Sequence, residues 1–492
     1  MREGSLQGRR YVVLAVMASM AMISVEATIV STAMPGIAAQ FGDLTLYSWV
    51  FSSFLLAQTA MTVVFGKLAD MFGRKPIMLL GISIFLIGSF FAGFAWSMPT
   101  MIAFRFIQGV GAGAIQPVAM TIIADLYPGE QRGKVQGYLA SVWAISAVLG
   151  PIAGSAIVHS FSWAWIFWLN IPIGIAGAWL FLVFLREKRK PTVVEIDLLG
   201  AALFTTSVAA LMIALTDMQS ASVGTTVLSA VVFLVSLIGF LIVEQRVREP
   251  MISLALWRRR SIAAANCATL LASMALMGLT TFLPIYVQAV LGRSPAISGL
   301  ALTMVLVGWP AAATLAARTY PRFGLRRLMI FGSFLVPSGA AFFALLGQNS
   351  SPFTAGIGSF VMGSGMGLIS ICSLILIQGA VEWRERGSAT ASNLFSRNLG
   401  STLGAAILGA VMNYGLSRAS TGSAIVDDRI ARILNGTALL DTNNDILRNV
   451  LERSIHTTFT AVFLISLAIV IACIAVKRDV PSGSGRVELN EH

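Results

Sequence analysis

The chain has 492 residues, of which 56% are apolar and only 11% are charged, and its mean hydropathy is +0.81. Soluble proteins carry about twice that charged fraction, so the composition excludes an ordinary soluble domain and indicates lipid as the main solvent. The net charge of +12 would suit nucleic-acid binding, but the basic residues fall in short gaps between apolar runs, which is the pattern of membrane topology.

Apolar runs long enough to cross a bilayer follow one another from end to end. A spanning helix needs about 20 mainly apolar residues, because each rises about 1.5 Å across a core of about 30 Å. Fourteen spans are predicted, at 11–36, 46–66, 77–96, 100–122, 135–158, 165–185, 198–216, 223–243, 262–290, 297–316, 328–347, 353–379, 388–414 and 454–476. Lysine and arginine gather in every second gap, which predicts that both termini are cytoplasmic.

The first run is too long for a signal peptide and is predicted to be an uncleaved span. Each of the three cysteines stands alone in an apolar run with no histidine nearby, so we expect buried thiols and no metal site. The longest gap, 415–453, mixes acids and bases, and its end, DILRNVLERSIHTTF, is typical of an amphipathic lead-in to the last helix.

The sequence repeats at the scale of half the chain. Segment 66–81 aligns with 317–332, and GVGAG at 109–113 aligns with GSGMG at 363–367. This predicts two six-helix bundles with two extra helices between them. The predicted units are a first bundle at 1–190, an inserted helix pair at 191–255, a second bundle at 256–478 that includes an outer loop at 415–453, and a cytoplasmic tail at 479–492.

Five motifs stand in one order along the chain. They are VEATIVSTAMP at 25–35, GKLADMFGRK at 66–75, RFIQGVGAG at 105–113, GPIAG at 150–154 and WAWIFWLNIPIG at 163–174. In this order they resemble the major facilitator superfamily and, within it, the fourteen-helix drug:proton antiporters of the multidrug efflux type. Glu26 replaces the usual aspartate, Ser155 a glycine and Ala164 an arginine. The resemblance covers essentially the whole chain and implies an all-α membrane protein with the major facilitator fold.

The resemblance implies that the loop 66–75 gates the inner ends of the helices. Asp70 is expected to face the N-terminus of a helix in the other half near Ser388, where the helix dipole favours an acid. Arg74 is expected to pair with Asp125. The alternative is that Arg74 and Lys75 only set the topology. The implied gating residues are Gly66, Asp70, Gly73, Arg74 and Asp125.

Glu26 is the only acidic residue near the middle of a predicted span. A carboxylate in low dielectric can exchange a proton near neutral pH, so we expect Glu26 to couple transport to protons, modulated by Arg105. A structural glutamate hydrogen-bonded across helices is the alternative. Arg397 is expected at the midplane of the second half, where it either pairs with Glu26, binds an anionic substrate group or lipid phosphate, or is structural.

Other residues are assigned from their helices. Those expected to line a substrate cavity with Glu26 and Arg397 are Phe54, Gln58, Gln116, Trp143, Asn393 and Phe395, although lipid-facing or packing roles are the alternative for each. The small residues Gly150 and Gly154, with Pro151 between them, predict close helix packing and a bend of the fifth span. The resemblance implies that these three residues are the antiporter motif of the family.

These features predict proton-coupled efflux of lipophilic, cationic drugs or toxic compounds by alternating access. No nucleotide-binding motif occurs, so we expect no cofactor and a proton gradient as the driving force. The alternatives are an exporter or flippase of lipids or a lipophilic anionic metabolite and, remotely, a membrane-embedded enzyme. The expected partners are small lipophilic substrates, protons and membrane lipids, with no nucleic acid, for a monomer in the bacterial plasma (inner) membrane.

Overall fold

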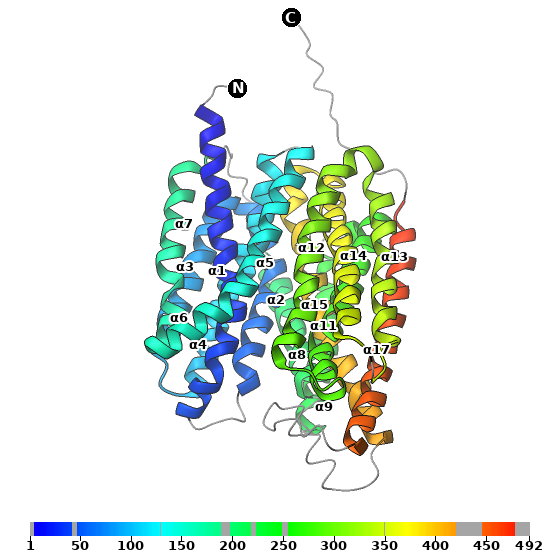
Figure 1. Ribbon diagram of the computed structural model, residues 1–492. Coiled ribbons are helices and arrows are strands. Elements are labelled where there is room, and N and C mark those ends of the chain that lie inside the picture. Colours follow the sequence, from blue (N-terminus) through cyan, green and yellow to red (C-terminus); the bar gives the residue numbers. More distant parts are fainter. Residues whose placement is uncertain are drawn as a thin grey trace, which may run out of the picture.

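The computed structural model describes residues 4–41, 47–127, 129–187, 197–217, 223–247, 254–348, 350–419 and 445–477 (Figure 1). Throughout these residues the regular structure is helical. The first half contains α1 (Gly4–Phe41), α2 (Tyr47–Phe72), α3 (Arg74–Ala92), α4 (Met98–Leu126), α5 (Gly129–Ser160), α6 (Ala164–Trp168) and α7 (Asn170–Phe184). The inserted pair is α8 (Leu198–Asp217) and α9 (Val223–Glu244). The second half contains α10 (Leu254–Arg258), α11 (Arg260–Ile285), a π-helical turn (Tyr286–Val290), α12 (Pro295–Phe323), α13 (Leu325–Ala344), α14 (Pro352–Gly379), a 3₁₀ turn (Trp383–Glu385), α15 (Arg386–Ala419) and α17 (Asp445–Ile474).

Twelve helices in the described residues are long and apolar enough to cross a membrane. The two other predicted spans, 135–158 and 198–216, correspond to α5 and α8, helices of 32 and 20 residues. The predicted all-α membrane fold is therefore confirmed, with a helix at each of the fourteen predicted places.

Helix starts follow from local sequence. Ser97 caps α4 and Ser351 caps α14, each through its hydroxyl to a backbone N–H of the first turn, and each is followed by a proline in that turn. Serine satisfies N–H groups that have no partner within the helix, and proline lacks an N–H to leave unsatisfied. The two serines lie 254 positions apart, within the repeat spacing.

The repeat is visible in the backbone. Gly73 precedes α3 with φ +105°, and Gly324, 251 positions later, precedes α13 with φ +82°. Glycine adopts such φ values without the steric penalty of a Cβ. On α4, a Cβ at Gly111 would lie 2.6 Å from the Gly81 carbonyl oxygen, and on α14 one at Gly365 would lie 2.6 Å from that of Gly332. The helix pairs therefore approach at backbone distance in both halves.

Each half forms its own bundle. In the first, α4 packs on α2 and α3, and α1 packs on α5 and α7; in the second, α14 packs on α12 and α13, and α11 packs on α15 and α17. The bundles meet where α2 contacts α15 and α5 contacts α12. The α8–α9 pair packs against α2 and α15, so it lies beside the seam between the bundles.

The first described turns of α1 and the last turn of α17 lie at the same end of the molecule (Figure 1). At that end Arg326 donates from Nε to the Val476 carbonyl at 2.6 Å, and the Lys477 amide donates to Ser261 Oγ at 3.3 Å. The predicted lead-in DILRNVLERSIHTTF is the start of α17, with Leu451 and Ile455 buried. Most of the predicted outer loop, 420–444, and the tail 479–492 lie outside the described residues.

Candidate functional site

A buried ion pair lies inside the first bundle. Arg105 Nη1 on α4 is 2.5 Å from Glu26 Oε1 on α1, and the two residues are 1% and 0% exposed. Asn170, the first residue of α7, donates from Nδ2 to Glu26 Oε2 at 2.5 Å. Each carboxylate oxygen therefore has a charged or amide donor, which offsets the cost of burying the charge.

The arginine is held on its other sides as well. Arg105 Nη1 also donates to Gln108 Oε1 at 2.7 Å, one turn along α4, and Gln108 Nε2 donates to Ser89 Oγ at 2.6 Å. Its Nε donates to the Val50 carbonyl at 3.4 Å, and its guanidinium lies 4.3 Å from the centre of the Phe54 ring. The network joins α1, α2, α3, α4 and α7, so a change of charge at Glu26 would be felt by most of the bundle.

The second cluster joins the two bundles at the end where α2 and α15 meet. Asp70 Oδ1 accepts from the Gly387 amide at 2.9 Å, and its Oδ2 accepts from the amide and hydroxyl of Ser388 at 2.7 and 2.9 Å. These amides belong to the first turn of α15, where free N–H groups and the helix dipole favour an anion. Asp70 is thus bound to the opposite bundle at the helix start that the sequence suggested.

Arg74 extends this cluster. Its Nη2 lies 3.0 Å from Asp70 Oδ1 and donates to the Trp383 carbonyl at 2.9 Å, while its Nε lies 3.2 Å from Asp125 Oδ2. The Arg74 guanidinium also lies 4.0 Å from the centre of the Trp383 ring. Arg386 pairs with the other oxygen of Asp125 at 3.2 Å. Acidic and basic side chains therefore alternate in the order Asp70, Arg74, Asp125 and Arg386, and the last of these belongs to the opposite bundle.

Two further contacts shape this end. A Cβ at Gly66 would lie 3.0 Å from the Gly387 carbonyl oxygen, so α2 and α15 touch through backbone there. Glu187, which follows α7, accepts from the amides of Arg74 and Lys75 at 2.9 and 3.2 Å and so caps the N-terminus of α3.

The residues expected to line a substrate cavity lie in different surroundings. Phe54, Gln58 and Gln116 are buried, and Gln58 Nε2 donates to Gln116 Oε1 at 3.4 Å. Asn393 is also buried and donates to Asn266 and Thr269 on α11. The remaining two aromatic residues are Trp143, 36% exposed on α5, and Phe395, which packs against Phe204 of the inserted pair. Glu26 has no exposed surface in this conformation.

Arg397 lies on α15 one turn after Asn393 and is partly buried. Glu26 pairs with Arg105, so the suggested pairing of Arg397 with Glu26 is not present in this conformation. Among the described residues Arg397 has no hydrogen bond and no ion pair. A partly buried guanidinium without a protein partner among the described residues leaves its five N–H donors available to a ligand.

In α5, Gly150 lies against α1. A Cβ at Gly150 would lie 3.0 Å from the Cβ of Thr28, and Thr28 Oγ1 donates to the Ser146 carbonyl at 3.2 Å. Gly154 is buried on the same helix, and the Pro151 side chain lies outside the described residues. The small residue therefore permits close contact between α1, which bears Glu26, and α5.

Gln108 and Asn170 stand within two of the five sequence motifs, but the motifs assign neither residue a role. No pattern in the sequence predicts a part in the site for Ser89, Glu187, Trp383 or Arg386. The signal for Gln108 and Asn170 was a buried polar side chain inside an apolar span, since such groups need partners. Trp383, which is exposed, and Arg386, which is partly buried, lie outside the predicted apolar spans and give no comparable signal.

The sequence matches the Major Facilitator Superfamily over residues 14–405. It is 37% identical over 414 residues to Multidrug resistance protein 3 of Bacillus subtilis, covering 82% of this chain and 79% of that protein. It is 30% identical over 430 residues to the Multidrug transporter protein MdtP of the same organism, covering 87% and 78%.

Solved structures share the fold. The human organic anion transporter MFSD10 (TETRAN) superposes with a TM-score of 0.65 at 16% identity, covering 94% of this chain and 99% of that one. The proton:xylose symporter XylE superposes with a TM-score of 0.58 at 15% identity, covering 92% and 94%. At these identities the likeness concerns the fold alone.

Proposed function

The chain belongs to the major facilitator superfamily, and we propose that it exports lipophilic, cationic compounds from a bacterial cytoplasm or inner leaflet in exchange for protons. The family and the relatives named above are transporters, so the chain is a transporter and not an enzyme. The names of the two Bacillus relatives as multidrug proteins support drugs as the cargo. The Glu26–Arg105 pair is the observation on which the proton coupling rests.

In this proposal protonation of Glu26 is the coupling step. The proton removes the negative charge that neutralises Arg105, so a buried guanidinium loses its counter-ion, at a cost of several kcal/mol. Because Arg105 is also bound to Gln108 and Val50 and Gln108 to Ser89, the bundle must rearrange to restore a partner. The ionised form of Glu26 would attract a cationic substrate once the bundle opens to it.

The cluster at Asp70 would provide the gate. Its contacts hold the ends of α2 and α15 together, which corresponds to a step of alternating access with the inner side closed. To open inward, the bundles must break the hydrogen bonds of Asp70 to Gly387 and Ser388. We further propose that this end is cytoplasmic, that the protein is a monomer in the plasma (inner) membrane, and that it needs no cofactor besides the proton gradient.

The test is uptake of the lipophilic cation ethidium into everted membrane vesicles with an imposed pH gradient. We expect Glu26→Gln to reduce proton-driven transport at least tenfold, because the amide cannot exchange the proton. Glu382→Gln is the matched control, since Glu382 is an exposed carboxylate. Transport by Glu26→Gln at the wild-type rate, and still abolished by a protonophore, would contradict the coupling role.

The unpartnered Arg397 favours a second candidate, export of a lipid or lipophilic anion. In it the guanidinium would bind a phosphate or carboxylate of the cargo. Arg397→Gln would then abolish translocation of fluorescent phosphatidylglycerol in proteoliposomes and leave ethidium transport unchanged. Ethidium transport without any phosphatidylglycerol translocation by the wild type would exclude this candidate.

A further inference from the structure

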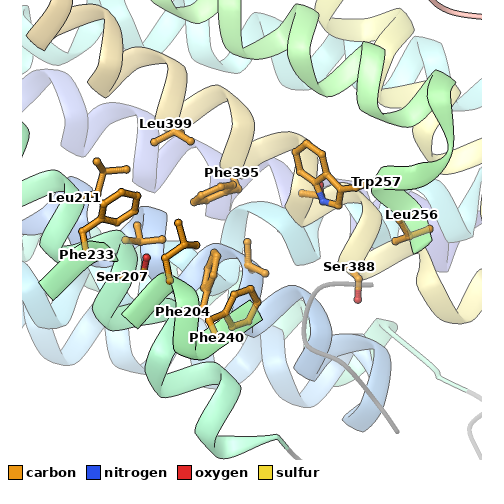
Figure 2. Close-up of a pocket in the computed structure, with 14 residues that line it drawn as sticks. Phe204, Ser207, Leu211, Phe233, Phe240, Leu256, Trp257, Ser388, Phe395 and Leu399 are labelled. Carbon is orange, nitrogen blue, oxygen red and sulfur yellow. The ribbon is translucent and has the colours of Figure 1, made fainter. Parts of the chain in front are cut away.

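An apolar cavity of about 310 Å³ lies between the inserted helix pair and the seam of the two bundles (Figure 2). Its walls come from α2, α8, α9, α10 and α15. The 14 lining residues include Phe204, Phe240, Phe395, Trp257, Ser388 and Leu399, and none of the 14 is charged. Three serine hydroxyls and the Trp257 indole N–H are the polar side-chain groups among them. An apolar lining of this kind favours a hydrocarbon ligand.

The cavity is long in the direction of the helices. Its lining on α15 runs from Ser388 to Leu399, which spans about 16 Å at 1.5 Å per residue. Figure 2 shows Leu399 and Leu211 at one end and Ser388 with Leu256 at the other. The volume lies at the lower end of the range of about 300–1,000 Å³ for small-molecule pockets. This shape suits one extended acyl chain.

One end of the cavity lies beside basic residues. Trp257 lines that end, and Arg258, Arg259 and Arg260, which follow it directly, are exposed. The neighbouring Ser261 hydroxyl accepts from the Lys477 amide, which places these arginines at the end of the molecule where α1 begins. Tryptophan is typical of the level of lipid head groups, and arginines there attract anionic lipids.

We propose that this cavity binds one acyl chain of an anionic phospholipid whose phosphate lies against Arg258 and Arg260. The lipid is a bound component and not the cargo. The site matches the parts of a lipid in their order. The apolar walls would contact the acyl tail, Trp257 would lie at the interface, and the exposed arginines would contact the head group. The site also gives the inserted pair a role, because α8 and α9 form one wall.

The position of the site connects it to the gate. Ser388 lines the cavity and also binds Asp70, and the walls come from both bundles. If the bundles alternate as proposed above, opening inward separates α2 from α15 and dismantles the site. A lipid bound there therefore favours the conformation with the inner side closed. This step alone rests on the proposed function.

The test is native mass spectrometry of the purified full chain with dioleoyl phosphatidylglycerol or dioleoyl phosphatidylcholine. We expect the wild type to retain one phosphatidylglycerol with at least tenfold preference over phosphatidylcholine. Leu237→Trp, which fills the cavity, should reduce retention at least tenfold. Val235→Trp on the same helix, at a position that is 66% exposed and does not line the cavity, should retain it as the wild type does.

A second variant tests the head group. Arg258→Gln with Arg260→Gln should abolish the preference for phosphatidylglycerol. Equal retention of the two lipids by the wild type, or wild-type retention by Leu237→Trp, would overturn the site. Loss of ethidium transport in Leu237→Trp with unchanged phosphatidylglycerol retention would also overturn it and place the cavity on the drug path. Retention is measured without transport, so failure of the proposed efflux function would not affect this result.

Discussion

Replacing Asp70 with asparagine should loosen the contact between the bundles. The carboxylate accepts three hydrogen bonds from Gly387 and Ser388. Asparagine keeps one acceptor oxygen, and its amide nitrogen would face N–H donors. Loss of two bonds to a charged group, at about 1.5 kcal/mol each, removes about 3 kcal/mol. Since each 1.4 kcal/mol is a factor of ten, local opening should become about 150-fold more frequent.

Hydrogen–deuterium exchange of the protein in lipid nanodiscs measures this opening directly. Peptides covering 66–74 and 386–392 should exchange up to about 150-fold faster in Asp70→Asn. Peptides covering 317–325, the segment that repeats 66–74 in the second bundle, should keep the wild-type rate. Glu382→Gln, which removes an exposed carboxylate near the same end, is the control. If Asp70→Asn exchanged like this control, the hydrogen bonds of Asp70 would not hold the bundles together.

Two other variants test the packing of the first bundle. Arg105→Met should destabilise the protein by about 3–5 kcal/mol, because it leaves Glu26 buried without a counter-charge. Adding Glu26→Gln to this variant should recover much of the lost stability. Thermal unfolding in detergent measures both variants, and additive losses of stability would argue against the ion pair. Gly111→Val should cost about 1–3 kcal/mol in the same assay, because its Cβ would lie 2.7 Å from Phe85 Cα. Gly347→Ala, with open space around it, should unfold at the wild-type temperature, and equal shifts in both would contradict the close-approach argument.

Much of the site was predictable because its residues are chemically unusual for their positions. A carboxylate at Glu26 and a guanidinium at Arg105 are expensive inside a membrane, so the sequence alone indicates that they need partners. Asp70 was placed at the start of α15 through the resemblance to a family, and the structure has that contact. The roles of these residues in proton coupling and gating remain predictions.

The partners that complete the network were not predictable in the same way. Gln108 lies one turn from Arg105, but its own partner Ser89 lies on α3, and Asn170 reaches Glu26 from α7, 144 residues along the chain. Trp383 is exposed and follows no apolar pattern, yet it stacks on Arg74 from the opposite bundle. Contacts of this kind depend on the angles at which helices pack, which the period of apolar residues does not determine.

The number and order of helices, the two-fold repeat and the positions of the buried charges were determined by the sequence itself, because hydropathy, helix length and the cost of burying a charge act on each segment separately. Only the tertiary structure decided how Glu26 is shared between Arg105 and Asn170, why Arg397 has no partner among the described residues, and where the inserted pair packs. Lipid solvates every outer face alike, so hydrophobicity cannot choose which apolar helices touch. Close packing and pairing of polar groups make that choice.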